Sequence, residues 1–184
     1  MSGSGCPRCS KGITICWFNI KVSTNFFFLV QIQIIKKEDF YPWQKKLADI
    51  VSGQIHDRTI YWIWEEFGNT GKSAMVKYLV VQQGALLLGG KGADIKYMIA
   101  THVQKKKTYP RVILYDIPRT IKDYVSYTSI EEVKNACFCS SKYESTMVVG
   151  NAPHFICMAN FPPEEDKLSR DRWDIKEIID KDFI

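Results

Sequence analysis

One run of residues limits what this chain can fold into more than any other feature: Gly68-Asn69-Thr70-Gly71-Lys72-Ser73. An apolar, strand-like stretch at 60–64 precedes it, and apolar residues at helical spacing follow it. In this setting a glycine-rich loop can wrap the phosphates of a nucleoside triphosphate with its backbone N–H groups. Lys72 is expected to reach the β and γ oxygens and Ser73 to hold Mg²⁺, beside the positive end of the helix dipole.

This loop departs from the strict phosphate-loop pattern at one position. The pattern has a glycine six residues before the lysine, and Glu66 stands there instead. The motif is therefore incomplete when it is taken alone, and the rest of the chain has to support it.

Length, charge and cysteine content bound the class of protein. With 184 residues, 46% of them hydrophobic, the chain is long enough for one globular domain with a sizeable core. The net charge of +5 mildly favours polyanionic partners. Cys137 and Cys139 are only two residues apart and Cys157 lies in an apolar run, so we expect no disulfide framework but a reduced chain, in the nucleus or cytoplasm. Cys6 and Cys9 form a lone C-x-x-C without the second pair that a zinc knuckle needs.

The N-terminal stretch at 13–35 is apolar enough to raise the question of a membrane. Polar residues interrupt it, so it contains no run of about 20 apolar residues, and we expect no membrane span. It also lacks the apolar block and small-residue cleavage site of a signal peptide. Residues 26–34 have a strand-like pattern. We leave 1–38 as an unassigned N-terminal segment and expect the catalytic domain at 39–184.

Helical and strand-like patterns alternate along 39–184. Asp39 is expected to cap a helix that has Pro42 in its first turn, and Ser129 to cap a later one in a capping box with Glu132. One further helix is predicted directly after the phosphate loop and another over 95–103. Strands are predicted at 59–64, 85–88, 112–115, 147–149 and 154–159. This alternation predicts an α/β fold with a mainly parallel sheet flanked by helices.

Polar residues follow two of the predicted buried strands. Asp116 ends the run at 112–115, where an acid can hold Mg²⁺ directly or through water; the alternative is a turn cap before Pro118. Asn160 follows the run at 154–159, where it can orient an attacking water, or it can be a simple turn residue. Hydrolysis of a phosphate anhydride needs few other protein groups, because positioning and charge stabilisation do most of the work.

Taken together, these segments resemble a known family. They are TIYWIWEEFGNTGKS (59–73), GGKGADI (89–95), RVILYDIPR (111–119), YTSIEEVKNACFCSSKYES (127–145), PHFICMANFPP (153–163) and LSRDRWDI (168–175). The chain resembles, over about 40–176, the superfamily 3 helicase domain of the replication-initiator (Rep) proteins of circular single-stranded DNA viruses, the circovirus-like group. In that family the first loop glycine is often replaced. The resemblance implies a P-loop NTPase of AAA+-like fold that uses ATP and Mg²⁺ and assembles as a homo-oligomeric ring, a hexamer, around single-stranded DNA or RNA.

The resemblance also assigns roles to the residues that match the family's motifs. It places Lys72 and Ser73 in the first nucleotide motif, Asp116 in the metal motif and Asn160 on the sensor strand. All four would then act on one bound nucleotide.

Two further residues receive roles from the resemblance. Lys142, in the motif between Asp116 and Asn160, would lie near the nucleic acid. Arg172, the arginine before a tryptophan, would reach a neighbouring subunit's γ-phosphate as an arginine finger. The alternative for Arg172 is a surface salt bridge to Asp171 or Asp174.

Other residues are weaker candidates. The lysines at 105–107 can track phosphates or form a solvated loop, and Tyr61, Trp62 and Trp64 are expected to pack in the core rather than stack on bases. Full-length relatives in the resembled family carry an N-terminal nuclease domain with paired metal-binding histidines and a Tyr-x-x-Lys motif. Neither feature occurs in this sequence, so we expect no nicking or joining of DNA.

The leading hypothesis is an ATP-dependent single-strand translocase or helicase acting in viral DNA replication. One alternative is a non-motor ATP- or nucleic-acid-binding remnant of a captured viral Rep gene. Another is a small-molecule kinase, which needs an arginine-rich substrate lid, and the sequence has no clustered candidate for such a lid.

Overall fold

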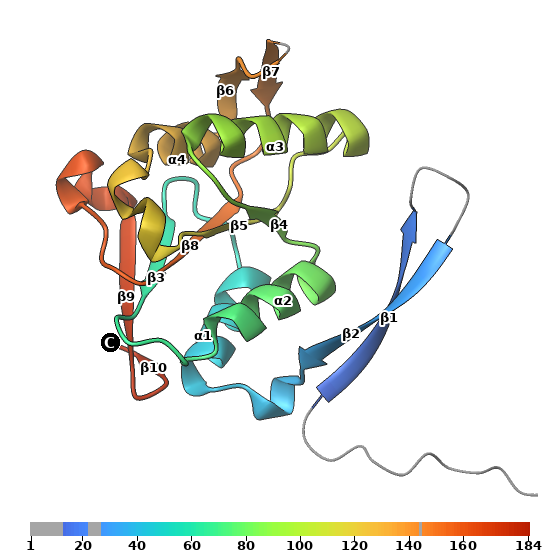
Figure 1. Ribbon diagram of the computed structural model, residues 1–184. Helices are drawn as coiled ribbons and strands as arrows, with labels where there is room; N and C mark the ends of the chain where they lie inside the picture. Colours follow the sequence, from blue (N-terminus) through green and yellow to red (C-terminus); the bar gives the residue numbers. More distant parts are fainter. Residues whose placement is uncertain (1–12, 22–26, 144) are drawn as a thin grey trace, which may run out of the picture. The chain divides into compact units, whose positions relative to one another are not determined.

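The computed structural model describes residues 13–21, 27–143 and 145–184 (Figure 1). The chain divides between Phe40 and Tyr41 into two compact units, which are described separately. Cys6 and Cys9, the lone C-x-x-C pair, lie outside the described residues.

The first unit contains an antiparallel hairpin. Strand β1 (Ile13–Lys21) pairs with β2 (Phe27–Ile35) along its whole length, and a 3₁₀ turn, η1 (Lys37–Asp39), follows. The strand expected at 26–34 is confirmed as β2. Across the described parts of both units, no helix is both long and apolar enough to cross a membrane.

The second unit is built around a six-stranded sheet. The strand order is β10-β9-β3-β8-β5-β4, and every neighbouring pair is parallel except β9 with β10. The bounds are β3 (Ile60–Trp64), β4 (Leu86–Leu88), β5 (Val112–Asp116), β8 (His154–Ala159), β9 (Trp173–Ile179) and β10 (Asp182–Phe183). All residues of β8 are buried, as expected for a parallel strand covered on both faces.

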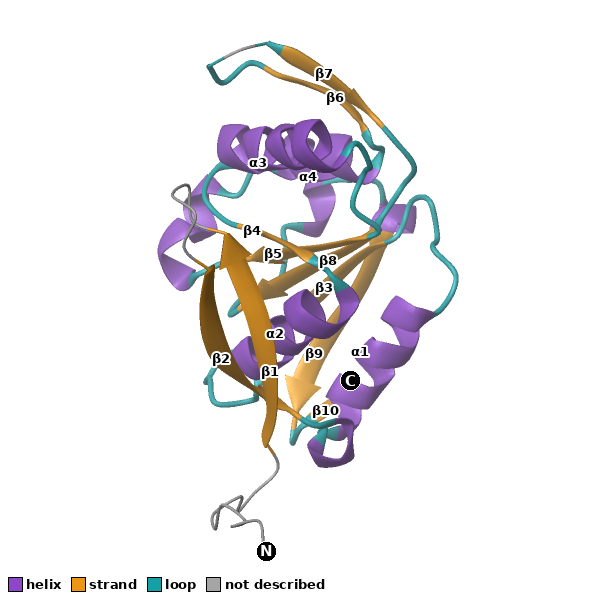
Figure 2. Ribbon diagram, turned by 90° about the vertical axis from the view of Figure 1, so that its right-hand side faces the viewer, coloured by secondary structure: helices purple, strands orange, loops and turns teal. Residues whose placement is uncertain are grey.

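Helices cover both faces of this sheet (Figure 2). Helices α1 (Pro42–Ser52) and α2 (Lys72–Gln83) lie on one face, and α3 (Gly92–Lys106) and α4 (Tyr127–Lys134) on the other. Three short 3₁₀ helices complete the unit: η2 (Arg119–Tyr124), η3 (Glu165–Lys167) and η4 (Arg170–Arg172). One core cluster joins the α3–α4 face to the sheet through Trp62, Ile99, Ile130 and Phe155. The predicted α/β fold, a mainly parallel sheet flanked by helices as in P-loop NTPases, is confirmed.

A second hairpin stands apart from the main sheet. Strands β6 (Cys137–Ser140) and β7 (Thr146–Val149) pair only with each other, antiparallel, above α3 in Figure 1. The strand predicted at 147–149 therefore exists but belongs to this hairpin and not to the parallel sheet. Strands β6, β9 and β10 were not predicted, because their short or charge-interrupted sequences lack the continuous apolar run of the central strands.

The cap predicted for the first helix is wrong. Asp39 lies in η1, and α1 starts after Tyr41, whose backbone N–H donates to Gln44 Oε1 at 2.9 Å. Pro42 fixes the first helical position, so the start of the helix is set by the proline and not by the aspartate.

The cap predicted for α4 is also wrong. The N-cap is Ser126, whose Oγ accepts from the Ser129 N–H, so the helix begins three residues earlier than expected. Tyr127 favours this start because its buried ring stacks on Trp62 with centroids 6.1 Å apart. Glu132 is then free to accept from Lys96 Nζ of α3 at 2.9 Å.

Candidate active site

The predicted polar residues meet at one edge of the sheet. In the strand register Trp64 is opposite Ala159 and Asp116 is opposite Met158, so β3, β8 and β5 all end there. The phosphate loop follows β3, and Asn160 follows β8. Ligands of parallel α/β sheets bind in the crevice outside the carboxyl ends of the strands. The topology therefore gathers the residues that the sequence placed at three strand ends.

The backbone of the phosphate loop curls through left-handed conformations. Gly68, Asn69 and Gly71 have φ angles of 91°, 60° and 87°. Glycine adopts such angles without the steric cost that a Cβ brings. At Gly71 an added Cβ would also stand 2.8 Å from Gln44 Nε2. The backbone conformation therefore favours glycine at 71, and a Cβ there would also displace the Gln44 amide.

Side chains of helix α1 form hydrogen bonds to the backbone of this loop. Trp43 Nε1 donates to the Thr70 carbonyl oxygen at 3.0 Å, and Gln44 Nε2 donates to the Gly71 carbonyl oxygen at 3.1 Å. Both side chains are buried. The loop is thus preorganised by the neighbouring helix, which lowers the conformational cost of binding a ligand.

The loop surrounds a cavity of about 290 Å³. Its lining is residues 68–74, Glu65 and Asn160. The first N–H groups of α2 have no partner within the helix and carry the positive end of its dipole. Thr70 Oγ1 is buried and has no hydrogen-bond partner among the residues that the structure describes. The cavity therefore offers several donors and a cation, which is the chemistry that fits the phosphates of a nucleotide.

Glu65 is a central residue of this cavity that the sequence analysis missed. It is 3% exposed and accepts hydrogen bonds from Lys72 Nζ, from the Gly68 N–H and, at 3.3 Å, from Asn160 Nδ2. Burial alone would raise the pKa of Glu65, but the hydrogen bonds from Lys72 and Gly68 outweigh it and lower the pKa. Glu65 is thus an ionised partner of Lys72. Its position directly after a buried strand, like that of Asn160, is the signal that could have found it.

Asp116 and Ser73 lie at the same edge. Asp116 ends β5, and its charge acts on Lys72. Partial burial raises the pKa of the Asp116 carboxyl, and the positive charge of Lys72 opposes this rise. Ser73 is exposed in the first turn of α2. A carboxylate and a hydroxyl are oxygen ligands of the kind that Mg²⁺ prefers, so both residues fit the metal role expected for them.

Glu66, at the non-glycine position of the motif, does not enter the cavity. Its side chain is exposed, and its carbonyl oxygen accepts from the Arg119 guanidinium. The departure from the strict motif therefore leaves the wall of the cavity intact.

Arg172 lies at the opposite edge of the sheet. It precedes β9, and Trp173 is opposite Ile60 at the start of β3, so a full strand separates it from its own phosphate loop. It is 4% exposed; its Nε lies 2.9 Å from Glu131 Oε1, not aligned for a hydrogen bond, and its Nη1 donates to Asn135 Oδ1 at 3.1 Å.

The salt bridge considered for Arg172 has other partners than expected. Asp171 pairs with Arg58, and Asp174 pairs with Lys176 at 2.8 Å. The pairing with Asp171 or Asp174 is therefore wrong, because the Arg172 side chain turns inward to α4 rather than along the surface.

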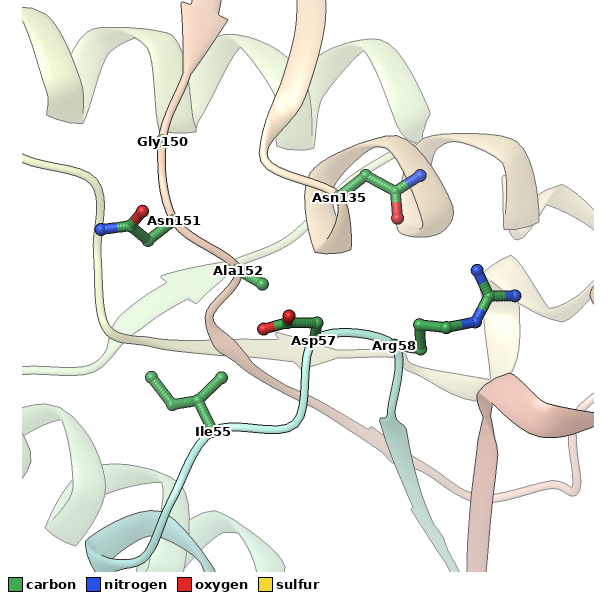
Figure 3. A pocket seen from close by; sticks show the side chains of 7 residues that line it. All are labelled: Ile55, Asp57, Arg58, Asn135, Gly150, Asn151 and Ala152. Carbon is green, nitrogen blue, oxygen red and sulfur yellow. The ribbon is translucent and has the colours of Figure 1, made fainter.

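A larger hollow of about 540 Å³ lies at this far edge (Figure 3). Its walls are the loops before β3 and β8 and the end of α4, with the side chains of Asp57, Arg58 and Asn135. Beside it, the buried Lys134 Nζ donates to the carbonyl oxygens of His56 and Pro153, both at 2.6 Å. Burial lowers the pKa of Lys134 to about 8. The sequence analysis did not single out this lysine, which links the loop before β3 to the loop before β8 through these hydrogen bonds.

Lys142 is not part of the phosphate-loop cavity. It lies between β6 and β7, and its Nζ forms an ion pair with Asp94 of α3. The lysines at 105–107 end α3 as exposed residues, with Lys107 as its C-cap. Trp62 and Tyr61 are buried and Trp64 packs, partly buried, against the core cluster, which confirms the expected core role of these strand aromatics.

Comparison with known proteins finds Para-Rep proteins of alphasatellites among the relatives of this chain. No protein-family model matches the chain. It is 35% identical over 146 residues to Para-Rep C1 of Faba bean necrotic yellows C1 alphasatellite, covering 74% of this chain and 50% of the relative. It is 36% identical over 137 residues to Para-Rep C6 of Subterranean clover stunt C6 alphasatellite, covering 73% of this chain and 46% of the relative.

These matches make the Para-Rep proteins of alphasatellites homologues of this chain, in keeping with a Rep-like protein. The chain spans about half the length of the curated relatives it matches.

Proposed function

We propose that this chain is an ATP-dependent translocase or helicase of the Rep type, which moves along single-stranded DNA or RNA in replication. One observation carries the proposal: the phosphate loop encloses a cavity lined by Lys72, Ser73 and Asn160, with Asp116 at the same edge of the sheet. The Para-Rep names of the relatives support a role in replication. The superfamily 3 helicase resemblance of the sequence supports the motor activity.

The residues at this edge of the sheet have distinct roles in the proposed reaction. The loop N–H groups and Lys72 bind the β- and γ-phosphate oxygens, so Lys72 has to leave Glu65 when ATP enters. Ser73 and Asp116 would hold Mg²⁺, which neutralises phosphate charge when bound. Asn160, already hydrogen-bonded at the cavity wall, orients the attacking water.

The position of Arg172 at the sheet edge far from the phosphate loop supports assembly of the subunits into a ring. An arginine that acts on a neighbour's γ-phosphate has to come from a surface remote from its own phosphate loop, and Arg172 lies at such an edge. To act as the finger it has to leave Glu131 and Asn135. We propose a homohexameric ring around the single strand, in the nucleus or cytoplasm of the host cell.

ATP turnover with and without single-stranded DNA or RNA tests the motor. Wild type is expected to hydrolyse ATP, with stimulation by nucleic acid and a rate per subunit that rises with protein concentration as rings form. Lys72→Ala is expected to abolish turnover, whereas Lys77→Ala, which removes an exposed lysine from the same helix, is expected to leave it unchanged. No turnover by the wild type, with or without nucleic acid, contradicts the proposal.

Mixed subunits test the finger. Arg172→Ala subunits keep the phosphate loop, and Lys72→Ala subunits keep the arginine, so a mixed ring contains some complete sites. Partial recovery of turnover on mixing supports action in trans. No recovery, with both variants folded and assembled, argues for a structural role of Arg172.

A second candidate function is a nucleotide- or nucleic-acid-binding module without motor activity. The burial of Arg172 between partners of its own chain favours it, because a guanidinium held there does not reach a neighbour. Binding of ATP and single strands by the wild type, without turnover at any protein concentration, supports this candidate.

A further inference from the structure

A further pocket, of about 270 Å³, lies between α3 and the β6–β7 hairpin. Its lining includes Tyr97, Thr101 and Gln104 from the helix and Ser140, Tyr143 and Thr146 from the hairpin. It shares no lining residue with the phosphate-loop cavity. Its volume lies just below the range of pockets for drug-sized ligands, roughly 300–1,000 Å³, so it suits one small planar group.

Two aromatic rings in contact with each other line this pocket. The ring centroids of Tyr97 and Tyr143 are 5.0 Å apart at an interplanar angle of 61°, and the side chains are 36% and 79% exposed. Tyr143 also has a φ of 63°, a left-handed conformation that is uncommon for a bulky residue. The hairpin thus holds a large apolar ring out in solvent at a conformational cost, which is a pattern typical of binding sites.

The pocket is also lined by polar groups without a full set of partners. Ser140 is 1% exposed, and its Oγ has no hydrogen-bond partner within the described part of the chain. A buried hydroxyl in that state is costly, and a ligand that donates to it or accepts from it removes the cost. Within the described residues, Gln104 Nε2 donates a long hydrogen bond, 3.3 Å, to Thr146 Oγ1, and a side-chain amide can make further hydrogen bonds as donor and acceptor.

A lysine stands at the rim. Lys142 Nζ lies 5.9 Å from the Tyr97 ring centroid and 5.6 Å from that of Tyr143, and it pairs with Asp94. Its exposure leaves the ammonium accessible to an anion in solution. An aromatic platform, a donor–acceptor wall and a cation at the rim together match a nucleotide of a single strand, with its planar base and its phosphate.

We propose that this pocket holds one unstacked base of the single-stranded nucleic acid, with Tyr143 stacking on the base and Tyr97 packing against its edge. Ser140 and Gln104 bind the edge of the base, and Lys142 binds the adjacent phosphate. The inference rests on the proposed function, because it names where the single strand is gripped. It assigns the grip to bases as well as to the phosphate backbone.

Fluorescence anisotropy of labelled oligonucleotides tests the pocket. The probes are a short thymidine oligonucleotide and one of equal length that keeps the phosphates and sugars but lacks the bases. Tyr143→Ala is expected to weaken binding of the first on the order of 10-fold, the range of one lost base–aromatic stack, and to leave binding of the second unchanged. Tyr143→Phe keeps the ring and is expected to bind like the wild type.

Two matched variants separate the pocket from general effects. Tyr124→Ala removes a tyrosine that is 59% exposed elsewhere, and it is expected to leave both affinities unchanged. Lys142→Ala removes the phosphate contact and is expected to weaken binding of both probes alike. Uridine oligonucleotides in place of thymidine show whether RNA or DNA supplies the base, and thermal unfolding shows that each variant is folded.

The possible outcomes separate the pocket from the ATPase. An equal loss on both probes for a folded Tyr143→Ala, or no loss on either, overturns the base pocket. Wild type that hydrolyses ATP but binds both probes equally also overturns the pocket and leaves the proposed ATPase in place. Selective, Tyr143-dependent binding of the base-containing probe without ATP turnover supports the pocket and overturns the motor.

Discussion

The ion pair between Glu65 and Lys72 gives the sharpest prediction from the structure. Glu65→Gln keeps the shape of the side chain but removes the negative charge that faces Lys72. The Lys72 and Glu65 side chains are 11% and 4% exposed, so the remaining ammonium has little contact with water and keeps only the charge of Asp116, which forms no ion pair with it among the described residues. The substitution is therefore expected to destabilise the nucleotide-free protein.

Two estimates bound the loss of folding stability, one from breaking the ion pair and one from deprotonating Lys72. Removing one partner of a buried ion pair costs about 3–5 kcal/mol. Lys72 can instead lose its proton, and deprotonating an ordinary lysine at neutral pH costs about 4–5 kcal/mol, so this route sets a similar ceiling. Burial already lowers the pKa of Lys72, which brings the expected cost to the lower end, about 3 kcal/mol. For a domain of this size that corresponds to a fall in Tm on the order of 10 °C.

Nucleotide binding is expected to favour Glu65→Gln over the wild type, the opposite of the effect on stability without nucleotide. In the wild type Lys72 has to leave Glu65 for the phosphates, whereas in Glu65→Gln the phosphates supply the missing counter-charge. ATP with Mg²⁺ is therefore expected to bind the variant more tightly, by up to about 100-fold if the full 3 kcal/mol is recovered. Thermal unfolding with and without nucleotide, together with isothermal titration calorimetry, measures both effects.

Glu66→Gln is the matched control. Glu66 is the next residue, is exposed, and has no ion pair with any residue that the structure describes. It is expected to have the Tm and ATP affinity of the wild type. If Glu65→Gln matched Glu66→Gln in both measurements, Glu65 would not be the counter-ion of Lys72 and the reasoning would be refuted.

Three further predictions follow from single residues. Gly71→Ala places a Cβ at a φ of 87°, 2.8 Å from Gln44 Nε2, and is expected to cost about 1–2 kcal/mol or more in chemical denaturation and to weaken nucleotide binding. Burial raises the pKa of Asp116, so its contribution to folding stability falls as pH rises through the folded pKa. Mg²⁺-dependent nucleotide binding needs the ionised carboxylate, so calorimetry is expected to show weaker binding at acidic pH. Burial lowers the pKa of Lys134 from 10.5 to about 8, so the unfolded chain binds this proton more tightly and stability is expected to rise by about 3 kcal/mol between these pH values, measured by urea unfolding.

Each of these has a control within the chain. Gly68→Ala has a similar φ of 91° but no atom near the added Cβ, so equal losses at 68 and 71 would show that the contact with Gln44 does not matter. Asp116→Asn is expected to remove the pH dependence of Mg²⁺-dependent binding, and a profile unchanged from the wild type would exclude the assigned role. Lys134→Met is expected to lack the alkaline rise, and parallel pH profiles of variant and wild type would contradict it.

The central strands and the phosphate loop could be predicted from sequence because local patterns determine them. Buried parallel strands are apolar on both faces, so β3, β5 and β8 show as continuous runs whose ends give the site edge. Strand β9 alternates charged and apolar residues at intermediate burial, so only its pairing with β3 identifies it.

The residues that were missed or misjudged depend on tertiary contacts. Glu65 gains its role from Lys72 and Asn160, which lie beyond the reach of a local pattern. Ser129 is the better cap by local pattern, because Glu132 follows it three residues later, and the packing of Tyr127 on Trp62 favours Ser126 instead. No sequence pattern distinguishes a buried arginine from an exposed one when its partners come from another helix, as at Arg172.

The central claim is that a nucleoside triphosphate with Mg²⁺ binds in the cavity around Lys72. Isothermal titration calorimetry of the purified chain with ATP and Mg²⁺ measures this directly, with Lys77→Ala as control and circular dichroism to check folding. Saturable heat for the wild type and Lys77→Ala, and none for a folded Lys72→Ala, is the predicted result. Absence of binding to both ATP and GTP by the folded wild type would contradict the account.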